Sequence, residues 1–406
     1  MLAFTIASAG CALAPDVQIL LATRIAQGLV AAPLVPMAMS MLFGKDGRPA
    51  SAAPAAAMPA AAGMLLFLGP ALGPSVGGAL IGAVGWRSIF LINVPTGLAA
   101  VIAVRKIPAR LAPGPSTGAR LDARGLLLLA AGLALLLLGV TLAGSDGWAA
   151  PACWPPLLSG AALLAGYARW SGRVDQPVLN LALARRRIPA LALALCAMAS
   201  VVTFSVVFLL PVFVQSVQDH SALATGLAML PQGLITGLST TLGQRALRLV
   251  TVRATVTSGL ALLTVASLGL LAIGARTPLA FTAALLAARS VSIGLVISPL
   301  LAVLTGPLAA AELNDASTLF SIWQRIAGSL GIGLIAAVYA QQARTHGPVA
   351  ALHVTGVAIA AICALGLLAT PLLPAERNLV PFSRQRAVLE QASDRGGPSR
   401  TAPRAR

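Results

Sequence analysis

Long apolar runs, separated by short charged or Gly- and Pro-containing segments, follow one another along most of the 406 residues. A helix needs about 20 apolar residues to cross a membrane, whereas spanning strands would give short alternating segments, which do not occur here. The pattern therefore predicts an all-α polytopic membrane protein. The expected spans, about twelve in number, are 1–14, 18–43, 53–82, 87–104, 125–144, 152–168, 189–214, 223–242, 254–274, 278–305, 313–340 and 349–373.

Composition supports this class. Hydrophobic residues make up 58% of the chain and charged residues only 10%, whereas soluble domains carry roughly 25% charged residues. The net charge of +17 would suit a nucleic-acid partner only if the cations were gathered on one soluble face, but here they lie between the spans. We therefore expect no nucleic-acid partner.

Candidate chemistry outside the membrane is sparse. Four cysteines, Cys11, Cys153, Cys196 and Cys363, fall in apolar runs without CxxC spacing, so neither a disulfide framework nor a metal site is indicated. No Walker motif occurs, and no nucleophile, base and orienting acid stand together. We expect no enzymatic activity and no cofactor.

The positive charges predict the orientation. Of the 28 Lys and Arg residues, 22 lie in alternate loops and the tail, while the opposite loops hold Arg87, Arg276 and Arg344. Positive loops stay in the cytoplasm, so both termini are expected there, in a cytoplasmic (inner) membrane. The tail, 375–406, is rich in Arg, Pro, Ser and Gly, and is predicted to be disordered, with a basic charge that suits anionic lipid.

The first span is short. Its 14 residues would give a helix of about 21 Å, against a hydrocarbon core of about 30 Å. A cleaved signal peptide ending at Ala12-Leu13-Ala14 is the alternative, but no Lys or Arg precedes Arg24 to supply a positive start.

The stretch GPALGPSVGG at 69–78 combines helix-breaking residues with an ordered spacing. Gly69, Gly73 and Gly77 are spaced i, i+4, i+8, so they share one helix face, which predicts close helix packing. The stretch also resembles the antiporter signature G-x-x-x-G-P-x-x-G-G of the major facilitator superfamily. The matching residues are Gly69, Gly73, Pro74, Gly77 and Gly78.

Two further motifs strengthen the resemblance. LLATRIAQGLVAA at 20–32 resembles the R-x-x-Q-G element of that superfamily, through Arg24, Gln27 and Gly28. WRSIFLINVPTG at 86–97 resembles the start of the sixth span in the fourteen-span drug:proton antiporters, the EmrB/QacA-like branch. Shorter matches at 121–125, 208–218, 226–234 and 323–334 extend the likeness over nearly the whole chain.

The resemblance implies a major facilitator fold and four regions. These are a partial four-span N-terminal bundle at 1–104, basic loops with two linker spans at 105–188, a six-span C-terminal bundle at 189–374, and the tail. Only two spans precede the antiporter signature, where the family has four, so the chain resembles spans 3–14 of fourteen. The implied function is proton-coupled efflux of drugs or other small molecules by alternating access. A transport-incompetent fragment and a membrane interaction protein remain alternatives.

Three arginines lie within predicted spans, where an ionisable residue is costly and indicates function. Arg24 belongs to the R-x-x-Q-G element, and Arg325 matches a basic residue that the family has in the same span. We assign both to coupling or gating; for Arg24 the alternative is that the side chain snorkels to the outer membrane surface. For Arg289 two roles are equally open: contact with an anionic group of the substrate, or pairing with carbonyl groups inside the bundle.

Carboxylates are placed differently. All 11 Asp and Glu residues lie at span edges, in loops or in the tail, and Asp315 and His353 are the nearest substitutes for a deep proton carrier. The resemblance implies the proton gradient as the energy source, but the missing deep acid predicts that proton coupling in this chain is weak.

Transporter sites lie near the midplane of the membrane. Residues expected to line the substrate cavity are Asn93, Met198, Phe204, Phe208, Gln215, Gln232, Arg289, Phe320, Trp323 and Gln324. A broad apolar cavity suits lipophilic, drug-like compounds, and without a deep acid neutral or anionic ones are as reasonable as cations. The sequence identifies neither the substrate nor a periplasmic adaptor.

Overall fold

A computed structural model describes residues 1–32, 34, 73, 76–105, 122–174, 177–179, 181–306 and 313–375. Within these ranges the regular structure is helical. Seven of the described helices are long and apolar enough to cross a membrane, and three shorter apolar ones accompany them. The prediction of an all-α polytopic membrane protein is confirmed.

The chain forms two compact units. The first comprises 1–121, 210–237 and 273–287, and the second comprises the remaining residues. Three helices contribute residues to both: α9 (Arg187–Ser216), α10 (Ala222–Leu249) and α12 (Leu279–Thr305).

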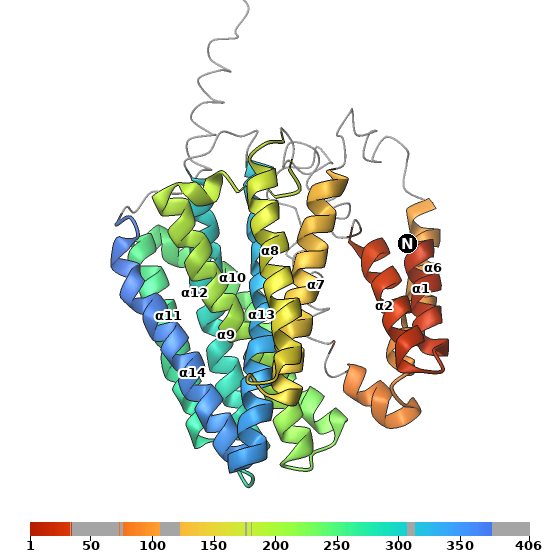
Figure 1. The fold of residues 1–406 in the computed structure, drawn as a ribbon. Helices are drawn as coiled ribbons and strands as arrows, with labels where there is room; N and C mark the ends of the chain where they lie inside the picture. Colours follow the sequence, from red (N-terminus) through yellow and green to blue (C-terminus); the bar gives the residue numbers. More distant parts are fainter. Residues whose placement is uncertain are drawn as a thin grey trace, which may run out of the picture. The chain divides into compact units, whose positions relative to one another are not determined.

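In the first unit, α1 (Leu2–Leu13) packs against α2 (Val17–Ala31), α5 (Ser88–Leu91) and α6 (Asn93–Arg105) (Figure 1). The turn between α1 and α2 is fixed by Asp16, whose carboxylate accepts a 2.8 Å hydrogen bond from the backbone N–H of Ile19 and so caps α2. α1 and α6 approach closely at Gly97, where a Cβ would lie 3.2 Å from Thr5 Cβ. These contacts bring polar residues of three helices together.

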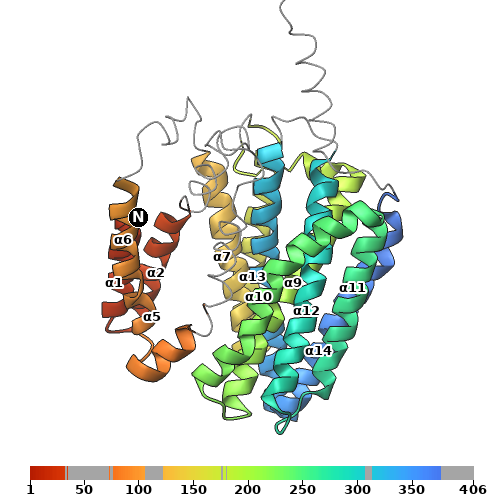
Figure 2. The same cartoon turned by 180° about the vertical axis from the view of Figure 1, so that it is seen from behind.

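The second unit contains the long helices. A hairpin of α7 (Ala123–Asp146) and α8 (Trp154–Ser171) packs through α7 on α13 (Leu313–His346). On the other side of α13 lies α14 (Pro348–Ala369), which also contacts α11 (Val252–Leu268) (Figures 1 and 2). Short 3-10 segments, Pro151–Cys153, Leu183–Arg185, Gly269–Ala272 and Thr370–Leu372, join or extend these helices.

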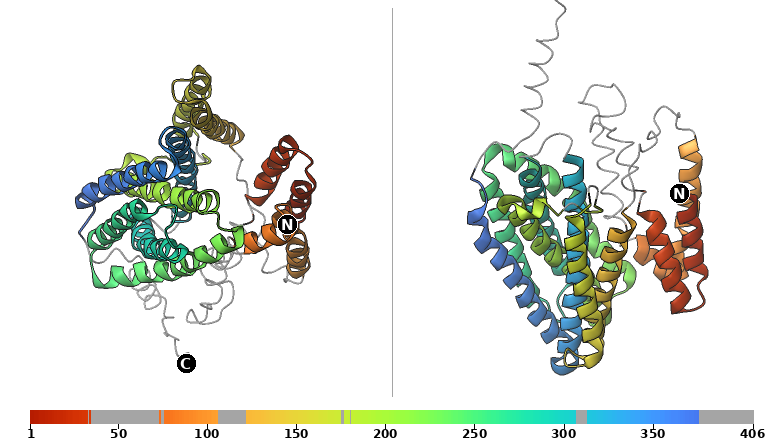
Figure 3. Two further views of the ribbon diagram at one scale, coloured as in Figure 1. Left: turned by 90° about the horizontal axis from the view of Figure 1, so that it is seen from below. Right: turned by 45° about the horizontal axis from the view of Figure 1, so that its top comes forward.

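The two helices of the α7–α8 hairpin approach each other most closely at glycines. A Cβ at Gly160 would lie 2.7 Å from the Leu136 nitrogen and 2.8 Å from the Gly132 oxygen, so only glycine fits. Figure 3 shows the two helices running side by side along their length. Such backbone contacts replace the hydrophobic driving force that is missing between helices in lipid.

Helix boundaries follow the predicted spans with three differences. α10 and α13 run past the expected ends at 242 and 340, to Leu249 and His346. The span at 87–104 is broken at Ile92 into α5 and α6. Pro95 has no N–H to donate to the carbonyl of Leu91, which explains a break just before it.

Parts of the predictions fall outside the described residues. These are most of 33–75, the loop 106–121 and the tail beyond 375. The division into 1–104, 105–188, 189–374 and the tail stays a prediction.

Candidate functional site

Arg24 and Gln27 meet side chains of α1. The guanidinium of Arg24 donates from Nη1 to Oε1 of Gln27 at 2.9 Å, and Gln27 donates from Nε2 to the hydroxyl of Ser8. Cys11 Sγ lies 3.9 Å from the same Gln27 oxygen. Gln27 is 4% exposed and Ser8 is fully buried, whereas Arg24 is exposed, so the arginine closes the open end of a buried amide network.

Two further residues complete this Arg24 cluster, which we define as Ser8, Arg24, Gln27, Phe90 and Asn93. Asn93 Nδ2, at the start of α6, donates to Ser8 Oγ at 3.3 Å. The Arg24 guanidinium stacks 5.5 Å from the centroid of the Phe90 ring, within range of a cation–π interaction. Four helices therefore hold one polar group.

Three residues of the R-x-x-Q-G element can now be located. Arg24 and Gln27 are hydrogen-bonded to each other, but Gly28 has no described atom within 4 Å of a Cβ built on it, and the coupling role of all three stays a prediction. Asn93, expected in the cavity wall, bonds into the cluster. Ser8 was missed, because a single serine in an apolar run carries no distinguishing spacing.

A second deep arginine lies in the other unit. Arg289 on α12 is 3% exposed, and its Nη1 and Nη2 donate to Ser267 Oγ and to the Val202 carbonyl, both at 3.2 Å. Ser267 in turn donates to the Leu263 carbonyl at 2.7 Å. Of the two roles left open by the sequence, pairing with a bundle carbonyl is the one visible here.

Comparison with known proteins identifies the family of the chain. The sequence model of the Major Facilitator Superfamily matches residues 1–332. This chain belongs to the Major Facilitator Superfamily. Its relatives include a Multidrug resistance protein B homolog of Mycobacterium tuberculosis, 32% identical over 84% of this chain, and the Puromycin resistance protein pur8 of Streptomyces alboniger, 28% identical over 82%.

The Multidrug export protein EmrB of Escherichia coli is 30% identical over 58% of the chain, so the resemblance to the drug:proton antiporter branch is confirmed. The chain spans only part of these curated relatives: 63% of the mycobacterial protein, 66% of pur8 and 45% of EmrB.

The antiporter motif of this superfamily member is described at three glycines. A Cβ at Gly78 would lie 2.8 Å from the carbonyl carbon of Ala222 and 3.2 Å from Leu223 Cα, so the motif helix touches the start of α10 through backbone. Gly73 and Gly77 have no described atom within 4 Å of such a Cβ. Gly69 and Pro74 lie outside the described residues. Among the described residues close contact is thus visible at Gly78, and packing along the stripe of Gly69, Gly73 and Gly77 stays a prediction.

Some predicted cavity residues of α9 and α13 take part in helix packing, and others are exposed. Trp323 Nε1 donates to the Leu193 carbonyl at 3.0 Å, and the Phe204 ring lies against Gly328, where a Cβ would come within 2.7 Å of Cδ2. Phe320 is buried, while Phe208 is exposed. Met198 and Gln324 are partly exposed.

Gln215 and Gln232 belong to the first unit, as does Asn93. Gln215 is exposed, and the buried Oε1 of Gln232 has no hydrogen-bond partner among the described residues. A single cavity formed by all these residues stays a prediction.

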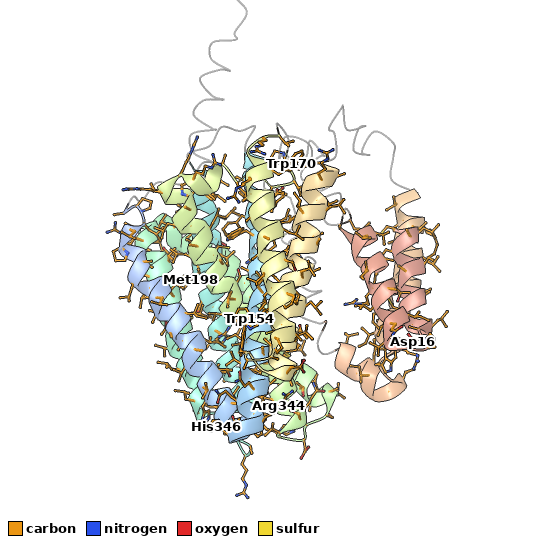
Figure 4. All side chains as sticks on the ribbon, viewed as in Figure 1. Asp16, Trp154, Trp170, Met198, Arg344 and His346 are labelled. Carbon is orange, nitrogen blue, oxygen red and sulfur yellow. The ribbon has the colours of Figure 1, made fainter. Side chains whose placement is uncertain are left out.

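Acidic residues whose side chains are described lie at helix ends. Asp16 and Asp122 cap α2 and α7, Asp146 ends α7, and Asp219 sits in a turn at φ 55°. Figure 4 shows Asp16 at one end of its helix, and Trp170 at the opposite end of the second unit from Arg344 and His346. Asp315 is part of α13, its side chain being outside the described residues, and Arg325 is exposed on the same helix.

Asp122 belongs to a small cluster at the end of the α7–α8 hairpin. Its Oδ1 accepts hydrogen bonds from the Trp170 indole at 2.9 Å and from the Gly125 N–H at 2.8 Å. These donors, the indole first, hold the pKa of the Asp122 carboxyl below its usual value. Arg124 stacks 5.6 Å from the centroid of the Trp170 ring, so a charged group of each sign meets one aromatic ring.

Proposed function

We propose that this protein is a secondary active transporter that exports small lipophilic compounds across the cytoplasmic membrane by alternating access. The observation that carries the proposal is the Arg24 cluster. A guanidinium in a predicted membrane span is held by an amide and an aromatic ring, in a chain whose relatives are named for multidrug and puromycin resistance. A charged side chain inside the membrane that is held by polar or aromatic partners is typical of substrate or ion pathways.

The cluster is suited to gating. Arg24 bonds to Gln27 on its own helix and stacks on Phe90 of α5, while Ser8 and Asn93 tie α1 to α6. Movement of α5 relative to α2 would therefore change the partners of the charge. The basic loops favour both termini in the cytoplasm. Substrate recognition by an apolar wall with a few amides favours drug-like molecules of either neutral or charged character.

Efflux from a bacterial host that lacks its own drug pumps tests this proposal. Accumulation of ethidium, puromycin and a neutral lipophilic dye is compared for cells carrying the wild type, Arg24→Gln and Arg276→Gln. We expect wild type and Arg276→Gln to lower accumulation alike, because Arg276 is an exposed residue in a loop. Arg24→Gln should reduce the efflux rate by about tenfold, equivalent to about 1.4 kcal/mol in the barrier.

A second arm of the experiment adds a protonophore. The proton gradient is the proposed energy source, and weak coupling is expected because the acids with described side chains lie at helix ends. Efflux should therefore fall only in part, and complete abolition would contradict weak coupling. Equal accumulation in cells with and without the protein would instead favour a membrane interaction protein.

A further inference from the structure

Buried hydroxyl groups in the second unit follow a common rule. Ser200, Ser267 and Thr355 each donate to the carbonyl one turn earlier in their own helix, at 2.6, 2.7 and 2.8 Å. This local bond satisfies a hydroxyl where no other partner is near. Two serines depart from the rule: Ser205 is 1% exposed and Ser292 is 0% exposed, and neither hydroxyl oxygen has a partner among the described residues.

Both unpaired serines are neighbours of Arg289 by position. Ser292 follows Arg289 by three residues on α12, and Ser205 follows Val202 by three residues on α9, where the Val202 carbonyl accepts from Arg289. Residues three apart share a helix face and are displaced by about 4.5 Å along the axis. The two serines therefore lie within one turn of Val202 and Arg289, on α9 and on α12.

The charge of Arg289 also lacks an opposite partner in the described structure. Its hydrogen bonds go to a hydroxyl and a carbonyl, both uncharged. Neither α9, α11, α12 nor α14 contains an Asp or Glu, and the other ionisable groups on these helices are Arg187, Arg253, His353 and two cysteines. A buried cation without a counter-charge is expensive, and lipid increases that expense.

We propose that Arg289, Ser205 and Ser292 form a binding site for a small monovalent anion in the core of the second unit. The anion supplies the missing negative charge and accepts hydrogen bonds from the guanidinium and the two hydroxyls. A free chloride ion and the carboxylate of an exported compound share this chemistry. The second source rests on the proposed transport function, whereas the site itself does not.

Thermal unfolding of the purified full chain in detergent tests the site. Chloride replaces gluconate at constant ionic strength in one series, and benzoate replaces gluconate in a second series, with benzamide as the uncharged control. We expect an upward shift of about 2 °C or more with a saturating anion. A response to chloride alone identifies a free ion as the occupant, and a stronger response to benzoate identifies a carboxylate.

Variants locate the response. Arg289→Gln should abolish it, Ser292→Ala and Ser205→Ala should each weaken the apparent affinity by roughly fivefold, and Arg276→Gln should leave it unchanged. The serine variants keep the arginine, so they serve if Arg289→Gln does not fold. A bromide soak of crystals should then give one anomalous peak in contact with Arg289.

The proposal is overturned if neither anion shifts unfolding, if Arg289→Gln responds as the wild type does, or if bromide is absent from the arginine. Because unfolding is measured without transport, loss of efflux activity in cells does not affect this result.

Discussion

Arg24 and Arg289 both lie in apolar helices, yet the protein accommodates them in different ways. Arg24 is exposed and reaches an amide and an aromatic ring, whereas Arg289 is 3% exposed and reaches a hydroxyl and a carbonyl of neighbouring helices. An exposed cation can change partners at little cost, while a buried one is fixed by packing. The exposed arrangement of Arg24 suits gating, and the buried arrangement of Arg289 suits a binding site that keeps its geometry.

Truncation of the two arginines should separate these roles most strongly. Arg289→Ala removes a packed side chain and should lower the free energy of unfolding by about 2–4 kcal/mol, as large buried truncations do. Arg24→Ala should lower it by about 1 kcal/mol, because the side chain is exposed but its loss removes the charged donor to Oε1 of the buried Gln27. Unfolding in SDS titrations of the purified variants measures both.

A third variant distinguishes volume from charge at Arg289. Arg289→Met fills most of the space without the charge, so it should stay within about 1 kcal/mol of the wild type in gluconate. Equal destabilisation by Arg289→Ala and Arg24→Ala would break the contrast between the two regions.

Ser8 tests whether the Arg24 cluster works as one unit. Its hydroxyl accepts from both Gln27 and Asn93, so Ser8→Ala leaves one buried and one half-buried amide without their acceptor and should cost about 1–2 kcal/mol. Efflux should fall several-fold with it. Ser216→Ala is the control, since that exposed hydroxyl bonds to the Val212 carbonyl of its own helix and to no other group in the described part of the chain. Matching stability of the two variants would mean that the cluster does not couple its helices.

The sequence predicted much of the fold because lipid imposes a simple rule on chain composition. Each long apolar run became a helix wherever the structure describes it, and breaks came where chemistry requires them, as before Pro95. The R-x-x-Q spacing also placed Arg24 and Gln27 together. Contacts between runs were less accessible: the bond from Asn93 to Ser8 joins residues 85 positions apart, and no periodic signal records it.

The hydrogen-bond partners of Arg289 were also not predictable from the sequence. The sequence indicated a costly charge but left its partner open, since Val202 contributes a backbone carbonyl, which every residue has. Likewise, the glycine spacing at 69–77 predicts packing on one face, which stays a prediction, and it did not indicate the described contact of Gly78 with the backbone of Ala222. Which face of a helix meets a partner depends on the neighbouring helix, and the spacing within one helix cannot supply that.

The smallest expected effect concerns Asp122. Unlike the described hydrogen-bond partners of Arg24 and Arg289, which do not titrate, Asp122 is an acid that can be titrated. The pKa of Asp122 is lowered in the folded protein by the Trp170 indole and the Gly125 N–H. The carboxylate therefore contributes its full stabilisation above its pKa in the unfolded chain, about 3.9, and this stabilisation is lost as pH falls through the pKa in the folded protein. The protection factors for amide hydrogen exchange at the Asp122 end of the α7–α8 hairpin should therefore fall below about pH 4, while the protection factor of Gly160 stays unchanged. In Asp122→Asn this acid step should disappear, since the amide does not titrate. An identical step in that variant would assign the pH dependence to another group. The comparison of Asp122 with the two arginines, whose described partners do not titrate, would then fail.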